Sequence, residues 1–129
     1  METLGSKQKR FFRMLAPLFL KIGELGLEAS IGDAYRDPRV FGKMGESKGY
    51  GEANSNHKQR LAIDINLFRD GKYLPSTEDH RELGEWWESQ GGTWGGRFGD
   101  GNHYSLGSYG WLGKAWRDTV RLGKARQLR

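Results

Sequence analysis

The chain has 129 residues, of which 36% are hydrophobic, and this size suits one domain with a modest core. It contains no cysteine, which excludes disulfides, thiol catalysis and thiolate metal sites, so that any metal ligands must be histidines or carboxylates. The net charge of +5 and the isoelectric point of about 9.6 favour anionic partners, namely nucleic acid, wall polymers or membrane surfaces, without choosing between them.

The first predicted element is a helix that begins after Ser6 and ends near Leu25, and Pro17 is expected to kink or interrupt it. Four apolar side chains share its predicted buried face at helical spacing: Phe12, Leu15, Phe19 and Ile22. The apolar run is too short and too charged to cross a bilayer, and it lacks the features of a secretory signal. We therefore expect synthesis in the cytoplasm without a signal peptide, and no stable insertion into a membrane.

A short strand is predicted over residues 27–31, a turn at 36–38 and a long surface loop over 42–54. The clearest strand covers residues 61–68, where aliphatic side chains alternate with other residues. This alternation predicts that Asp64 points away from the aliphatic face.

Asp70 and Gly71 predict a hairpin, and a helix over residues 78–90 follows, with Ser76 or Thr77 as its cap. Its buried side is predicted to contain three residues: Leu83, Trp86 and Trp87. The two tryptophans are adjacent, so that one of them should be partly exposed. His80, in the first polar turn of this helix, is expected to face solvent.

The remaining chain is predicted to form a glycine-rich loop over 94–101, a strand over 103–106 and a basic helix over 111–129. His103 and Ser105 should share one face of that strand. The expected fold is a small α+β domain spanning residues 1–129, with its core at about 6–107 and helices packed on an antiparallel sheet.

Two clusters carry candidate chemistry, one from Ser55 to Asp64 and one from Trp94 to His103. A catalytic zinc takes three protein ligands and leaves one position for water, and a further carboxylate is needed to move the proton. The clusters contain two histidines, one carboxylate that can serve as a ligand and one spare carboxylate, Asp100. If the strands that carry these groups are neighbours, the groups can converge in a cleft between glycine-rich loops, where they would suit zinc.

Both clusters resemble signatures of the D-alanyl-D-alanine carboxypeptidase family of zinc peptidases, which includes L-alanyl-D-glutamate endopeptidases used as phage endolysins. Residues 55–64 (SNHKQRLAID) are similar to its Ser-x-His-x-x-Gly-x-Ala-x-Asp pattern. Residues 94–104 (WGGRFGDGNHY) are similar to its Trp-Gly-Gly pattern followed by Asp-x-x-His, and Tyr35-Arg36 is similar to a Tyr-Arg pair upstream. The resemblance covers about residues 6–107.

The resemblance implies roles for individual residues. The zinc ligands would be His57, Asp64 and His103. Asp100 would move the proton, and Arg36 would bind a substrate carboxylate or polarise the scissile carbonyl. Two further residues are candidates for substrate contact, each with a structural alternative: Ser55, which can instead stabilise its own loop, and Trp94, which can instead pack beside the site.

One position departs from the family pattern, because Arg60 stands where the family has glycine. Glycine can serve a left-handed backbone or a close approach, so that the local loop shape is the feature in question.

The resemblance implies a monomeric, zinc-dependent peptidoglycan hydrolase that cleaves the stem peptide, with the L-alanyl-D-glutamate bond preferred. It would act on the wall as an endolysin after release through a holin-type pore, and nucleic acid would not be a partner. Two alternatives stay open: a D-alanyl-D-alanine carboxypeptidase or dipeptidase, and a non-catalytic basic module that binds wall or nucleic acid.

Overall fold

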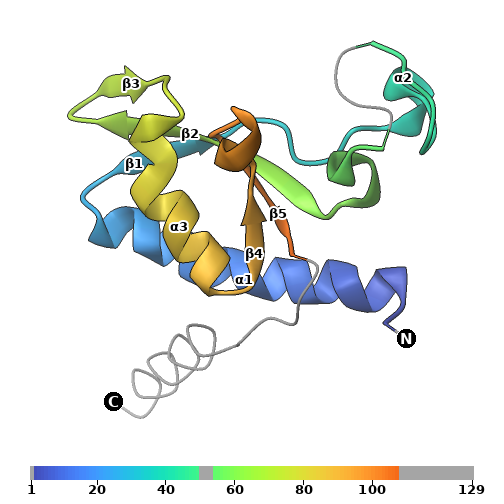
Figure 1. The fold of residues 1–129 in the computed structure, drawn as a ribbon, viewed down its shortest axis with the longest axis horizontal. Coiled ribbons are helices and arrows are strands. Elements are labelled where there is room, and N and C mark those ends of the chain that lie inside the picture. Colours follow the sequence, from blue (N-terminus) through green and yellow to red (C-terminus); the bar gives the residue numbers. More distant parts are fainter. Residues whose placement is uncertain (1, 50–53, 108–129) are drawn as a thin grey trace.

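The computed structural model describes residues 2–49 and 54–107 of the chain (Figure 1). The helices are α1 (Leu4–Glu24), α2 (Pro38–Phe41) and α3 (Arg81–Ser89), and three short 3-10 turns are η1 (Asn56–Gln59), η2 (Glu78–His80) and η3 (Gly95–Phe98). The strands are β1 (Glu28–Ile31), β2 (Ala62–Arg69), β3 (Lys72–Leu74), β4 (Gly92–Trp94) and β5 (His103–Leu106).

The strands form an antiparallel sheet in the order β1-β2-β5-β4, and β3 pairs with one end of β2. β2 is the longest strand and contacts β1, β3 and β5, so that it forms the centre of the sheet. Helices α1 and α3 lie along the sheet, and α2 lies with the loop that follows it at the far end from β3 (Figure 1). The α+β fold with helices on an antiparallel sheet is therefore confirmed.

The core lies between the sheet and the two longer helices. The predicted aliphatic row belongs to this core and is at most 5% exposed; it consists of Leu61, which precedes β2, and Ile63, Ile65 and Leu67 of β2. Trp87 of α3 packs edge-on against Phe11 of α1 at 6.2 Å between ring centroids, and both rings belong to this core. Because side chains alternate along a strand, Asp64 and Asn66 lie on the other face of β2.

Helix α1 begins three residues before the prediction, because its cap is Thr3, which accepts a hydrogen bond from the Ser6 backbone N–H. The predicted buried face is confirmed at Ile22, and Leu15 packs against the core, but the prediction is wrong at Phe12 and Phe19. Phe12 is 76% exposed and Phe19 is 45% exposed. The core side consists of Phe11, Met14, Leu18 and Ile22. Apolar residues occur all round this helix, so that spacing alone does not select the face that the sheet covers.

Three local predictions are corrected in detail. The expected turn at 36–38 is the start of α2, with the Asp37 carboxylate accepting from the Arg39 N–H. The glycine-rich loop of 94–101 contains the end of β4 and the turn η3. The helix expected over 78–90 starts as η2, where Ser76 and Asp79 each bond the other's backbone N–H.

Other local predictions are confirmed. The hairpin turn at Asp70 and Gly71 has positive φ at both residues and connects paired β2 and β3. In α3, Leu83 and Trp87 are buried and Trp86 is partly exposed. The predicted helix over 111–129 lies outside the described residues, as do positions 50–53 of the predicted loop.

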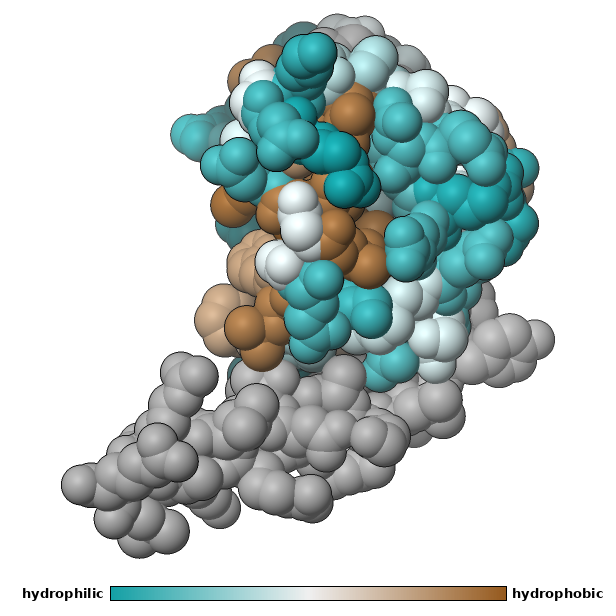
Figure 2. Space-filling view, turned by 90° about the vertical axis from the view of Figure 1, so that its left-hand side faces the viewer, coloured by the Kyte–Doolittle hydropathy of each residue, from teal (hydrophilic) through white to brown (hydrophobic). Residues whose placement is uncertain are grey.

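Within the part of the chain that the structure describes, none of the helices has the length and apolar character needed to span a membrane. Figure 2 shows one face of the molecule, on which hydrophobic residues gather in a strip between hydrophilic ones.

Candidate metal centre

The register of two neighbouring strands creates the site. In the antiparallel pair of β2 and β5, Asp64 lies directly opposite His103, and Ile63 lies opposite Tyr104. Ile63 and Tyr104 point into the core, so that Asp64 and His103 project together from the other face of the sheet. Side chains paired in this way are neighbours without any contribution from a flexible loop.

His57 reaches the same place from η1. The Ser55 hydroxyl caps this turn by accepting a hydrogen bond from the His57 N–H at 3.2 Å. The His57 side chain is 1% exposed, and its Nδ1 lies 3.0 Å from the Ala34 carbonyl oxygen. A carbonyl oxygen only accepts hydrogen bonds, so Nδ1 carries the proton and Nε2 presents a lone pair to the site.

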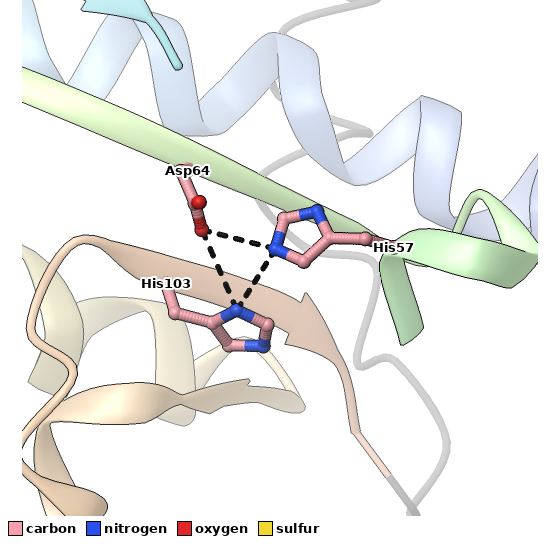
Figure 3. A group of neighbouring side chains, drawn as sticks. All are labelled: His57, Asp64 and His103. Carbon is pink, nitrogen blue, oxygen red and sulfur yellow. Dashed lines mark hydrogen bonds and ion pairs between the residues drawn. The ribbon is translucent and has the colours of Figure 1, made fainter. Parts of the chain in front are cut away.

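Three ligand atoms meet at this point (Figure 3). His57 Nε2 lies 3.1 Å from Asp64 Oδ1 and 3.2 Å from His103 Nδ1. His103 Nδ1 and Asp64 Oδ1 are 3.5 Å apart. The edges of a zinc tetrahedron with bonds of 2.0–2.1 Å are about 3.3 Å long, so the observed triangle fits three of its corners.

The chemistry of the donors also fits a cation. With Nδ1 of His57 protonated, its Nε2 lone pair faces a carboxylate oxygen and a second imidazole nitrogen. Acceptors so close together repel each other unless a proton or a metal ion lies between them. Among the described residues, His57, Asp64 and His103 form the group of potential ligands whose atoms converge in this way.

The electrostatics of Asp64 reflect the two imidazoles. Burial raises the pKa of Asp64, but the imidazoles of His103 and His57, once they are protonated, donate hydrogen bonds and place positive charge beside the carboxylate; these effects outweigh burial and lower the pKa of Asp64 to about 2. The carboxyl group is therefore ionised at neutral pH, which is the form that binds metals.

Asp100 lies at the mouth of the site. Its Oδ2 is 3.9 Å from His103 Nδ1, and its side chain is 62% exposed. The backbone N–H of His103 donates to the Asp100 carbonyl at 3.2 Å, which fixes the separation of the two residues. A carboxylate in this position is beside the ligand group and accessible to water.

Arg36 forms part of the wall beside Asp64. Its Nε donates to Asp33 Oδ2 at 3.2 Å, and its Nη1 donates to the Ser55 hydroxyl at 3.1 Å. Its Nη2 lies 3.9 Å from Asp64 Oδ2. The salt bridge considered as an alternative role is thus present, and the same side chain lines the cleft. Ser55 likewise has the local hydrogen bond and borders the cleft.

The cleft has a volume of about 460 Å³ and contains both expected and unexpected residues. It brings together Arg36, Ser55, His57, Asp100 and His103. Sequence reasoning assigned no site role to the other lining residues: Asn54, Asn56, Thr93, Gly95, Phe98 and Ser105. All six lie within two residues of a predicted site residue along the chain, and this proximity was the signal that could have identified them.

Trp94 lies beneath the site. It is fully buried, and its indole N–H donates to the Gly101 carbonyl at 2.7 Å. A direct contact with substrate does not fit this burial, so the packing alternative describes Trp94. The ring supports η3, because a Cβ on Gly96 would overlap it.

The expectation that His80 faces solvent is wrong. His80 is 2% exposed, and its Nδ1 lies 2.8 Å from the hydroxyl of Tyr104. Burial lowers the pKa of His80, against a smaller opposing effect of Asp79, and burial raises the pKa of Tyr104. The polar run at 78–80 indicated a solvated helix start, but the partner that buries the ring comes from β5, far along the chain.

Arg60, which stands where the family pattern has glycine, has a backbone conformation that favours glycine. Arg60 has φ of 61° and ψ of 36°, the left-handed conformation, and it ends η1 immediately after the His57 turn. Its guanidinium lies 3.9 Å from the centroid of the Tyr35 ring. A residue other than glycine in the left-handed conformation costs about 1 kcal/mol, and a cation–π contact of about 0.5–1 kcal/mol largely offsets this cost.

Comparison with known families adds an independent observation. Residues 48–106 match the family model of D-alanyl-D-alanine carboxypeptidase. The matched region covers less than half of the chain, and it includes the three converging residues and Asp100, whereas Arg36 lies upstream of it. No curated protein matches the chain.

Proposed function

We propose that the protein is a zinc-dependent hydrolase of bacterial cell wall, which cleaves an amide bond in the stem peptide of peptidoglycan. The convergence of His57 Nε2, Asp64 Oδ1 and His103 Nδ1 within 3.5 Å carries this proposal. The match of residues 48–106 to D-alanyl-D-alanine carboxypeptidase supports metallopeptidase chemistry. We take the chain as one peptidase domain with its core at 6–107.

We assign separate catalytic roles to the metal site and to Asp100. Zinc in such a site would supply Lewis acidity for activating water and polarising a carbonyl. Asp100 accepts the proton of the attacking water and transfers it to the leaving nitrogen, a role supported by its accessible position 3.9 Å from His103. Its contribution to the rate should be about 100- to 10,000-fold.

Arg36 binds a carboxylate or carbonyl oxygen of the substrate from the cleft wall. Stem peptides carry free carboxylates, and the planar guanidinium suits them. Asp33 and Ser55 hold this guanidinium in place, so that little side-chain freedom is lost when substrate binds. Ser55 thereby assists substrate binding through Arg36 while it caps the His57 turn.

The preferred bond is L-alanyl-D-glutamate, in an endolysin that reaches the wall through a holin-type pore. This finer assignment rests on the motif resemblance. The rival bond is D-alanyl-D-alanine, which the description of the matched family favours. Masses of the released fragments separate the two, because the endopeptidase releases a peptide that begins with D-glutamate, whereas cleavage of D-alanyl-D-alanine releases D-alanine.

The distribution of charge supports adhesion to an anionic wall. Residues 108–129 contain six Lys or Arg and one acid, which accounts for the whole net charge of +5. The remaining sequence therefore carries no net charge. Neutralising these basic residues should weaken salt-sensitive retention on purified wall and leave hydrolysis of short soluble peptides unchanged.

The decisive experiment is digestion of purified peptidoglycan by wild-type protein, by Asp100→Asn and by Asp70→Asn. Asp70 is the matched control, since it is an exposed aspartate in the β2–β3 turn and does not line the cleft. We expect wild type and Asp70→Asn to release peptides, a chelator to stop both and zinc to restore both. Asp100→Asn should bind zinc and cut at least 100-fold more slowly.

A wild-type protein that binds zinc but cuts no wall preparation would refute the hydrolase proposal. A protein that binds no zinc would refute the metal assignment as well. A non-catalytic module that binds nucleic acid would instead shift DNA in a salt-dependent manner without cutting wall.

A further inference from the structure

The lining of the cleft is uneven in polarity. The segment that leads into η1 contributes Asn54, Ser55 and Asn56 beside Arg36, all of which are polar or charged. The turn η3 contributes Phe98, which is the one large apolar side chain among the described residues that line the cleft. A ligand that fills this space therefore meets hydrogen-bonding groups in one part and an aromatic ring in another.

Phe98 is 82% exposed. Single exposed apolar residues are common on protein surfaces, so exposure by itself indicates little. The location is informative here, because Phe98 lies two residues before Asp100 and borders the same cleft as His103. An apolar ring at the mouth of a polar cleft gains most when a ligand covers it.

The backbone holds Phe98 in this exposed position. The preceding residue, Arg97, is bound to Glu88 of α3 through two hydrogen bonds of 2.7 and 3.1 Å. The Asp100 N–H donates to the Gly95 carbonyl at 3.0 Å, which closes the turn around Phe98. Gly96 lies so close to the Trp94 ring that no side chain would fit there. The turn is therefore anchored on both sides of Phe98.

We propose that Phe98 is a specificity-determining residue, which packs against an apolar side chain next to the scissile bond, such as the methyl group of alanine. The inference rests on the proposed function and adds to it the part of the substrate that this ring recognises. Stem peptides combine alanine methyl groups with free carboxylates, and this combination matches a cleft that contains both Phe98 and Arg36.

The test uses two synthetic stem peptides that differ only in alanine or glycine on the amino side of the cleaved bond. The proteins are wild type, Phe98→Ala, Phe98→Leu and the control Phe12→Ala, in which an equally exposed ring of α1 is removed. A methyl group that packs against an apolar surface changes kcat/KM by about tenfold. We therefore expect wild type to prefer the alanine peptide by about that factor.

Phe98→Ala should lose this preference through a higher KM for the alanine peptide, with kcat, zinc content and Tm unchanged. Phe98→Leu should keep most of the preference, and Phe12→Ala should keep all of it. Calorimetric binding of both peptides, with zinc present and Asp100→Asn added to each protein to suppress cleavage, provides the same comparison with little turnover.

The outcomes separate the two proposals. If wild type cuts the peptides and Phe98→Ala keeps the preference for alanine, the role of Phe98 is refuted and the hydrolase proposal stands. If wild type binds the peptides but does not cut them, the binding data alone decide the role of Phe98. A Phe98→Ala protein that no longer prefers the alanine peptide supports the proposed contact, and one that still prefers it overturns the contact. If wild type neither binds nor cuts, both proposals fail.

Discussion

Gly95→Ala tests how closely the fold positions the two halves of the site. Gly95 is buried at the start of η3, and a Cβ there would overlap the Asp100 carbonyl oxygen and lie 2.7 Å from the His103 Cβ. Ordinary carbon contacts are about 3.5 Å or longer, so the 100–103 turn must move by about 1 Å. This movement displaces a proposed metal ligand and the proposed proton-transfer residue together.

The size of the effect follows from that displacement. Misplacing reacting groups by about 1 Å costs about 100-fold in rate, and overpacking costs about 1–3 kcal/mol of stability. For a chain of this length, about 1 kcal/mol corresponds to about 4 °C in Tm. We therefore expect Gly95→Ala to lower kcat/KM on peptidoglycan about 100-fold and Tm by about 4–11 °C.

The assay is the clearing of a wall suspension, together with zinc content and thermal unfolding by circular dichroism. Gly23→Ala is the matched control, because Gly23 lies in α1 with no atom within 4 Å of an added Cβ. It should leave the rate unchanged and stabilise the helix slightly. A Gly95→Ala protein that clears wall at the wild-type rate and melts at the wild-type temperature would refute the reasoning.

Further predictions concern stability and metal binding. Tyr104→Phe leaves the buried His80 Nδ1 without its partner and should lower the free energy of unfolding by about 1–3 kcal/mol, measured by urea titration. The folded-state pKa of His80 is lowered below 6.5, so the unfolded chain binds the proton more readily; stability should fall as pH falls below about 6.5, and His80→Gln should flatten that part of the profile. Arg60→Gly relieves the left-handed strain but loses the Tyr35 contact. Its free energy of unfolding, measured by chemical denaturation, should therefore stay within about 1 kcal/mol of wild type, and its activity in wall assays should be unchanged. Zinc at about 100 times its Kd should raise the stability by about 2.7 kcal/mol, or Tm by about 10 °C, and Asp64→Asn should abolish that shift.

The local pattern was sufficient for the elements that bear the site. Alternation in residues 61–68 predicts a strand with Asp64 on its polar side, and the same rule applies to His103. The motif resemblance then picks out the three residues whose potential ligand atoms converge in the structure. These features could be predicted because period-2 geometry and donor chemistry are properties of a short stretch of chain.

The choice of helix face and the burial of His80 could not be predicted from local pattern. Helix α1 has apolar residues on several sides, and contact with the sheet decides that Phe11 is buried and Phe12 is exposed. His80 lies in a polar run, and the residue that satisfies its ring nitrogen is 24 positions further along the chain. Burial depends on which element packs against which, and this is a property of the whole fold.

The sequence by itself therefore determined the inventory of the site: two histidines and two aspartates on predictable strands and loops, without a thiol that could compete as a ligand. Only the tertiary structure decided that β2 and β5 pair with Asp64 opposite His103 and that His57 Nε2 comes within 3.2 Å of His103 Nδ1. The physical reason is that residue type fixes which atoms can donate electrons. Strand register and loop packing between distant segments fix whether those atoms meet.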